Sequence, residues 1–150
     1  MRKYGWWGLF AIAVVIVVFG ILDIASGAAA DVAIAEGLTG RAVADLEAES
    51  ADAFGLYDFM TRVNGLSLVL LGVLLATIIG IPFRRGEPWA WWAAWALPLW
   101  AAIVPVFYLV AGTDPSRPPP PPMVSGPIVA VFCAVILLFS RPRTADTGRS

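Results

Sequence analysis

Residues 63–83 read VNGLSLVLLGVLLATIIGIPF, a run without a single Asp, Glu, Lys or Arg. An α-helix needs about 20 consecutive apolar residues to cross the hydrocarbon core of a bilayer, which is roughly 30 Å thick. Three further stretches of the 150-residue chain meet or approach this length and also lack charge: Tyr4–Leu22, Pro88–Thr113 and Met123–Ser140. The sequence therefore predicts an all-α membrane protein, a bundle of four transmembrane helices.

Composition places the whole chain in the same class. Hydrophobic residues make up 59% of it and charged residues 14%, against roughly 25% charged residues in soluble domains. We expect a single membrane domain, with spans at about residues 4–26, 63–83, 88–112 and 123–140. The remaining segments are a partly helical outer loop at 27–62, a proline-rich outer link at 113–122 and a tail at 141–150.

The basic residues predict the orientation of the spans. Seven of the ten lie in three clusters: Arg2 with Lys3, Arg84 with Arg85, and Arg141 with Arg143 and Arg149. The alternate loops hold only Arg41, Arg62 and Arg117. The cytoplasmic flanks of membrane spans collect Lys and Arg. We therefore expect a multi-pass protein of the cell membrane, with both termini in the cytoplasm and the 27–62 loop outside.

The first span has a second interpretation. Arg2 and Lys3, the apolar run and the alanines at 28–30 resemble a signal peptide with a small-residue cleavage site. However, the run is longer than the usual stretch of about 7–15 residues, and Asp23 separates it from the alanines. We expect the first span to be retained, and its cleavage would leave the orientation of the later spans unchanged.

Two helical pieces are expected in the outer loop. Thr39–Phe54 predicts an amphipathic helix, which Gly37 and Gly40 separate from the residues before it. Phe54–Arg62 is expected to run directly into the second span. Within that piece, the acid at 58 and the base at 62 have the four-residue spacing of a helical ion pair.

Prolines shape the second half of the chain. The short link Arg84–Glu87 makes the second and third spans an antiparallel hairpin, and Pro88 suits the first position of a helix. Pro98 and Pro105 each remove a backbone hydrogen bond, so we expect the third helix to bend. Pro118–Pro122 predicts a stiff polyproline strut between spans, with recognition by a proline-binding domain as the alternative.

The third span also holds five of the seven tryptophans: Trp89, Trp91, Trp92, Trp95 and Trp100. Tryptophan is enriched at membrane interfaces, so a belt that also packs within the bundle is the first interpretation. The alternative is a ligand-binding wall that contains Trp92 and Trp100, which share one helical face.

Small residues four apart predict close helix contacts in lipid. Two spans show this spacing, one with Gly72, Ala76 and Gly80 and the other with Gly126, Ala130 and Ala134. Packing inside the bundle is the first interpretation. A homodimer or a larger membrane complex through either set is the second.

Asp23 is the acid that lies within or at the edge of a predicted span. A charge in a span is costly and therefore needs a partner. Arg62 and Asn64 lie at a similar depth at the outer end of the second span, so we expect Asp23 to pair with one of them. The alternative is a proton or cation site.

The sequence lacks the residues on which several classes of reaction depend. The chain has no His, and its single Cys is Cys133 within the fourth predicted span. There is no C-x-x-C motif, no intramembrane carboxylate pair and no glycine-rich phosphate loop. We therefore predict no metal, no cofactor and no nucleic-acid partner.

Residues 84–92, RRGEPWAWW, resemble a segment that follows the second span in uncharacterised small four-span membrane proteins of bacteria and archaea. The resemblance covers about Tyr57–Trp100 and implies the same fold without a known activity. A weaker similarity is to four-helix membrane proteins of the emopamil-binding type, which place acids in a central cavity. It implies a lipid-modifying enzyme, for which Asp23 and Glu87 are the available acids.

The first functional interpretation is a non-enzymatic membrane protein. It would be an accessory or structural subunit, or a module that binds a lipid or another small apolar ligand. The candidate ligand-binding residues are Asp23, Arg62, Asn64, Trp92 and Trp100. The alternatives are a small dimeric transporter with Asp23 as its coupling acid, and a lipid-modifying enzyme.

Overall fold

The computed structural model describes residues 4–112 and 119–141, and all regular structure in these ranges is helical. Four segments are long and apolar enough to cross a membrane: Gly5–Ala29, Ala51–Phe83, Pro88–Val110 and Pro121–Phe139. The chain is therefore a multi-pass integral membrane protein with an all-α fold, as predicted. Arg2, Lys3, Arg117, Arg143, Arg149, most of the proline-rich link and nearly all of the tail lie outside the described residues.

The helices follow one another without long gaps. In chain order they are α1 (Gly5–Ser26), the 3-10 turn η1 (Gly27–Ala29), α2 (Val32–Thr39), α3 (Val43–Glu49), α4 (Ala51–Ile78), the π-helical turn η2 (Ile79–Phe83), α5 (Pro88–Ala94), α6 (Ala96–Val110) and α7 (Pro121–Phe139).

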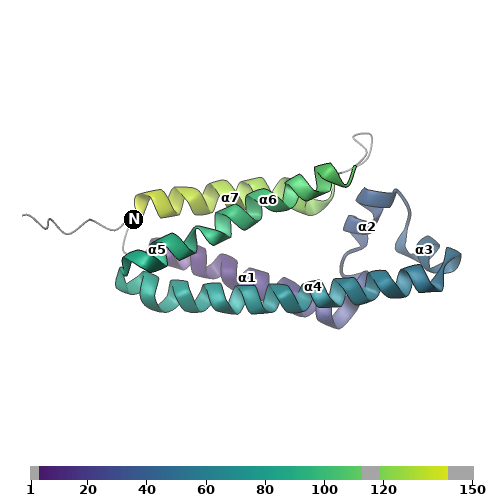
Figure 1. Ribbon diagram of the computed structural model, residues 1–150, viewed down its shortest axis with the longest axis horizontal. Helices are drawn as coiled ribbons and strands as arrows, with labels where there is room; N and C mark the ends of the chain where they lie inside the picture. The colour runs from purple at the N-terminus through teal and green to yellow at the C-terminus, as the bar shows by residue number, and fades with distance from the viewer. Residues whose placement is uncertain (1–3, 113–118, 142–150) are drawn as a thin grey trace, which may run out of the picture.

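The four spans form two antiparallel pairs (Figure 1). Helix α1 packs along α4, and α6 packs along α7, and these two contacts are the most extensive in the described part of the chain. We call the end where α1 begins and α7 finishes the terminal end; a Cβ built on Gly5 would lie 3.0 Å from the Ser140 hydroxyl there. The opposite end, which carries α2 and α3, is the loop end. The two pairs diverge towards it, and α2 stands between them.

The core lies towards the terminal end and joins the two pairs. Its buried residues come from every span: Leu9, Ala13, Ile16, Leu75, Ile79, Trp91, Ala94, Leu97, Cys133 and Leu137. The indole of Trp91 donates a hydrogen bond of 2.8 Å to the carbonyl of Leu137. That carbonyl belongs to the last turn of α7 and also accepts a hydrogen bond of 3.1 Å from the N–H of the C-cap residue, Ser140. Trp91 therefore ties α5 to the end of α7.

Backbone contact holds α1 against α4. Small residues recur every seven positions on both helices, at Ala13, Gly20 and Gly27 and at Gly65 and Gly72. A Cβ on Gly20 would lie 2.6 Å from the carbonyl oxygen of Gly65, and a Cβ on Gly72 would lie 2.9 Å from that of Ala13. Side chains at these positions would force the helices apart. In lipid, where helix association rests on close packing, this contact is the main source of attraction between the two spans.

The two predicted sets of small residues four apart, here called the small-residue ridges, both lie against other helices of the same chain at their glycine positions. Gly72 is buried against α1, and a Cβ on Gly80 would lie 3.3 Å from the ring of Phe10. A Cβ on Gly126 would lie 2.7 Å from the carbonyl of Ala101 in α6. The expectation of internal packing therefore holds at these positions. Association of two copies through the ridges stays a prediction.

The amphipathic helix predicted at Thr39–Phe54 is wrong. Gly40 has a φ of 70° and ends α2 in the left-handed conformation that favours glycine. Ser50 is extended, with a φ of −155°, and its hydroxyl accepts a hydrogen bond of 3.3 Å from the Ala53 N–H, so it caps the start of α4. Two local stop signals thus divide the predicted helix. The expected continuity of Phe54–Arg62 with the second span is confirmed.

Prolines act as predicted in one span and differently in another segment. The third span is bent at Trp95, because Pro98 has no N–H to donate to the carbonyl of Ala94 and its ring crowds that oxygen. The polyproline strut predicted at Pro118–Pro122 is wrong at its end, because Pro121 begins α7, where a helix tolerates proline in its first turn; Pro118 lies outside the described residues. Gly37, expected to separate the Thr39–Phe54 helix from the residues before it, lies inside α2, and a Cβ there would lie 2.7 Å from the ring of Pro120.

Gly72→Leu is expected to destabilise the protein by about 1–3 kcal/mol or more, because the new side chain must displace the backbone of α1. Gly55→Leu is the matched control, since a Cβ on Gly55 meets no heavy atom within 4 Å. Unfolding by heat or by sodium dodecyl sulphate, starting from a mild detergent, measures both. Equal stability of the two variants would show that α4 does not contact α1 at Gly72.

Candidate functional site

Asp58 and Arg62 of α4 hold the end of α1. The predicted ion pair is present, with Arg62 Nε donating to Asp58 Oδ2 at 2.8 Å. Arg62 Nη1 also donates to the carbonyl of Ile24 at 2.5 Å, and Asp58 Oδ1 accepts from the Ala28 N–H at 2.9 Å. A cation at a helix C-terminus is favourable, because the last carbonyls carry partial negative charge. Arg62 is therefore engaged in capping α1.

Asp23 lies beside this cap and pairs with Asn64. Its side chain is almost fully buried, at 5% exposure, on the face of α1 that meets α4. Asn64 Nδ2 donates to Asp23 Oδ2 at 3.3 Å, which confirms Asn64 as the partner expected from the sequence. Gly65 makes room for the acid, since a Cβ there would lie 2.6 Å from that of Asp23.

A second acid, Asp31, reaches the same region from the loop. The hydroxyl of Tyr57 donates a hydrogen bond of 3.1 Å to the backbone carbonyl of Asp31. Thr61 lies one turn after Tyr57 on α4 and is 4% exposed. Burial, followed by the nearby charge of Asp23, raises the pKa of Asp31 to about 6.

These side chains form the loop-end cluster: Asp23, Asp31, Tyr57, Thr61 and Asn64. The cluster links α1, α4 and the start of α2, so it docks the outer loop onto the α1–α4 pair. Among the described residues no group of three or more His, Cys, Asp or Glu side chains could hold a metal ion. Neither of the two pockets described below is lined by Asp23. The geometry therefore favours a structural role for this cluster.

An apolar groove lies on the α1–α4 pair towards the terminal end. It has a volume of about 470 Å³, is open on one side, and is lined by Trp6, Trp7, Phe10, Val17, Val73, Ala76, Thr77, Gly80, Ile81 and Arg84. The rings of Trp6 and Trp7 stack with their centroids 4.2 Å apart and form one wall. Ala76 and Gly80 carry little or no side chain and leave the floor open. We call this the α1–α4 groove.

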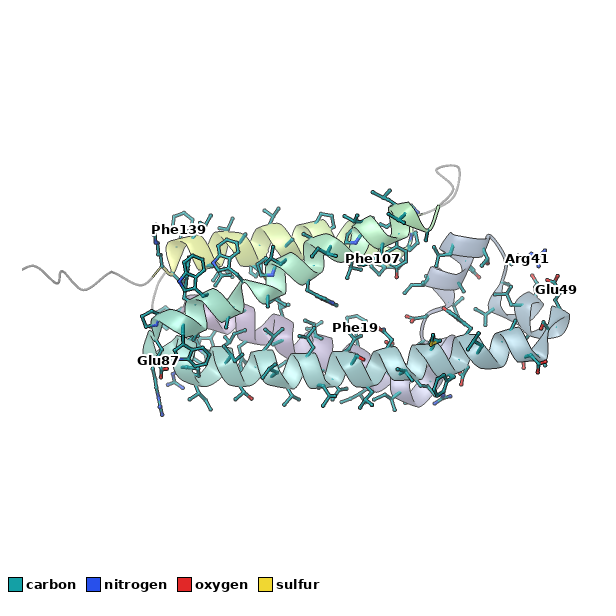
Figure 2. The ribbon with its side chains drawn as sticks, viewed as in Figure 1. Phe19, Arg41, Glu49, Glu87, Phe107 and Phe139 are labelled. Atoms are coloured by element: carbon teal, nitrogen blue, oxygen red, sulfur yellow. The ribbon has the colours of Figure 1, made fainter. Side chains whose placement is uncertain are left out.

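Arg84 is the charged residue of the α1–α4 groove. The carbon at the centre of its guanidinium lies 4.9 Å from the ring centroid of Trp6, a cation–π contact. A smaller pocket of about 160 Å³ adjoins it and includes Arg85, Glu87, Trp91 and Ser140. Figure 2 shows Glu87 and Phe139 at this terminal end, opposite the exposed Arg41–Glu49 ion pair at the loop end.

The two candidate tryptophans lie elsewhere. Trp92 is 69% exposed, and Trp100 is partly buried against the core. Neither lines the α1–α4 groove or the adjoining pocket, and their role in ligand binding stays a prediction. The sequence did not predict the α1–α4 groove, which Trp6 and Trp7 help to line. The sequence feature that could have predicted it is the combination of aromatic residues at the start of the first span with small residues near the end of the second.

Comparison with protein-family models, with curated proteins and with solved structures finds no match to this chain. The resemblance of residues 84–92 to small four-span proteins and the similarity to the emopamil-binding type stay predictions.

Asn64→Leu is expected to destabilise the protein by about 1–3 kcal/mol, because it leaves the buried carboxylate of Asp23 without its donor. Adding Asp23→Leu should recover most of this loss, since no unpaired polar group then remains. Ser67→Leu is the control, because the Ser67 hydroxyl bonds only within α4, to the Val63 carbonyl. Unfolding in detergent measures all variants, and an Asn64→Leu effect as small as that of the control would contradict the pair.

Asp31→Asn is expected to raise stability more at about pH 7.5 than at about pH 4. The folded pKa of about 6 lies above the ordinary value of 3.8, so the folded protein holds this proton more tightly than the unfolded chain. The cost of the charged acid therefore grows as pH rises between these values and is complete at neutral pH. The Asp31 side chain makes no capping hydrogen bond to α2, so the substitution removes none. Melting temperatures across this pH range test the sign, and a gain confined to low pH would contradict it.

Proposed function

We propose that this protein is a non-enzymatic lipid-binding module that holds an acyl chain of a membrane lipid in the α1–α4 groove. The observation that supports this is the groove itself, an apolar hollow that opens away from the bundle on two membrane-spanning helices. Three of its lining residues, Trp7, Val73 and Ile81, are about half exposed. In a membrane these side chains are covered by lipid.

The physical basis of such binding differs from that in water. Moving a chain from the bilayer into the groove gains no hydrophobic free energy, because lipid tails are as apolar as the groove walls. The gain comes from dispersion contacts with a shaped wall, which are small for each atom pair and large in sum. The rigid rings of Trp6, Trp7 and Phe10 provide such a wall at low conformational cost.

The same proposal includes an orientation. Arg84, Arg85 and Arg141, the basic residues described at the terminal end, support a cytoplasmic location for both termini, by the rule that cytoplasmic flanks are enriched in Lys and Arg. The α1–α4 groove would then face the cytoplasmic leaflet. Reporter fusions after Arg85 and near Glu47 test this orientation, since the first should report the cytoplasm and the second the outside.

Thr77→Trp is expected to fill the α1–α4 groove and to remove co-purifying lipid. The hydroxyl of Thr77 bonds only to the Val73 carbonyl one turn earlier, at 2.8 Å, so no tertiary hydrogen bond is lost. Val131→Trp is the matched control, because Val131 of α7 is 64% exposed and lies outside the groove. Native mass spectrometry of the detergent-purified variants counts bound lipids. Equal lipid retention by both variants would contradict the proposal.

A further inference from the structure

We infer that Arg84 binds the phosphate of an anionic glycerophospholipid whose acyl chain lies in the α1–α4 groove. This inference rests on the proposed function and adds the class of lipid and the residue that recognises it. The expected occupant has apolar chains next to a negatively charged head, and its source is the surrounding membrane.

Along its length the groove changes from apolar to positively charged, which matches the apolar chains and negative head of such a lipid. Its walls are apolar from Val17 and Val73 to Phe10, and Arg84 provides a positive charge at the terminal end. A chain that follows the walls brings its head to that end. Because the groove is formed by two spans, it also runs in the direction that lipid chains take in a bilayer.

The arrangement of Arg84 leaves its hydrogen-bonding edge available. The guanidinium lies over the ring of Trp6, with its central carbon 4.9 Å from the ring centroid. No ion pair of Arg84 with an acid occurs among residues 4–112 and 119–141. A guanidinium presents five N–H donors in its plane, in a fork that matches two phosphate oxygens. The cation–π contact with Trp6 is not a hydrogen bond to a carboxylate or carbonyl, so these donors remain available to a phosphate.

The neighbouring charges favour an anionic head over a zwitterionic one. The adjoining pocket holds Arg85 and one acid, Glu87. Glu87 already accepts a hydrogen bond of 2.6 Å from the indole of Trp89. A choline or ethanolamine head would bring an ammonium group next to two arginines. A head whose remaining groups are neutral or negative avoids this repulsion.

Arg84 and Arg85 provide a matched pair for the test. Both carry the same charge at the same membrane depth, but only Arg84 lines the α1–α4 groove. If the arginines attract anionic lipid only through surface charge, replacement of either one should have the same effect. Direct contact with the phosphate predicts a large effect at Arg84 and a small one at Arg85.

The experiment uses the full chain in nanodiscs made from equal amounts of phosphatidylglycerol and phosphatidylcholine. Bound lipids are counted by native mass spectrometry after release into the gas phase. We expect the wild-type chain to retain phosphatidylglycerol preferentially and Arg84→Gln to lower this preference by about tenfold, the loss expected for hydrogen bonds to a charged group. Arg85→Gln should lower it by less than about threefold, as a loss of surface charge only.

Arg84→Lys keeps the inference testable if the Gln variant fails to fold. Lysine retains the charge but is a compact ammonium that cannot form the planar fork, so the preference should still fall severalfold. An unchanged preference in the Lys variant, or equal losses in Arg84→Gln and Arg85→Gln, overturns the inference. A wild-type chain that binds lipid without preference overturns it as well and leaves the proposed function intact. Full lipid retention in Thr77→Trp overturns the proposed function.

Discussion

The rest of the structure depends on the contact between the backbones of α1 and α4. Gly20 lies against the backbone of Gly65, and Gly72 lies against the backbone of Ala13, with Val69 and Val17 packed beside these contacts. In water, apolar side chains would drive such an association. In lipid that force is absent, and dispersion contacts between closely spaced backbones replace it. The repeat of seven residues keeps the small positions on one seam along the length of both spans.

This contact determines what lies at each end of the pair. At the loop end it brings Asp23 next to Asn64 and places Asp58 and Arg62 at the last carbonyls of α1. The charged and polar groups that are costly to bury thereby gain hydrogen-bond partners. The outer loop docks on this region through Tyr57. At the terminal end the small residues of α4 meet the aromatic start of α1, and the mismatch in side-chain size leaves the α1–α4 groove. The same seam thus produces a closed polar cluster and an open apolar surface.

The class of the protein follows from sequence because bilayer thickness sets a length that uncharged runs must meet. The bend near Pro98 and the Asp58–Arg62 pair follow from local rules in the same way. The sequence predicted two possible partners for Asp23, Arg62 and Asn64. It could not choose between them, because the capping of α1 by Arg62 depends on how the helices are aligned. Asp31 was missed because its place near Asp23 depends on the docking of the loop. The error at Thr39–Phe54 came from an apolar pattern that two local stop signals, Gly40 and Ser50, override.

The most direct test of this account is a solid-state NMR measurement in lipid bilayers on protein whose glycine, alanine and valine residues carry ¹³C. It requires no substitution at the seam, so it reports the native contact. The account predicts a carbon–carbon cross-peak between Gly20 Cα and the carbonyl carbon of Gly65, and a second between Gly72 Cα and the backbone of α1. Cross-peaks from Gly20 and Gly72 to lipid acyl chains, in place of those to the opposite helix, would contradict it.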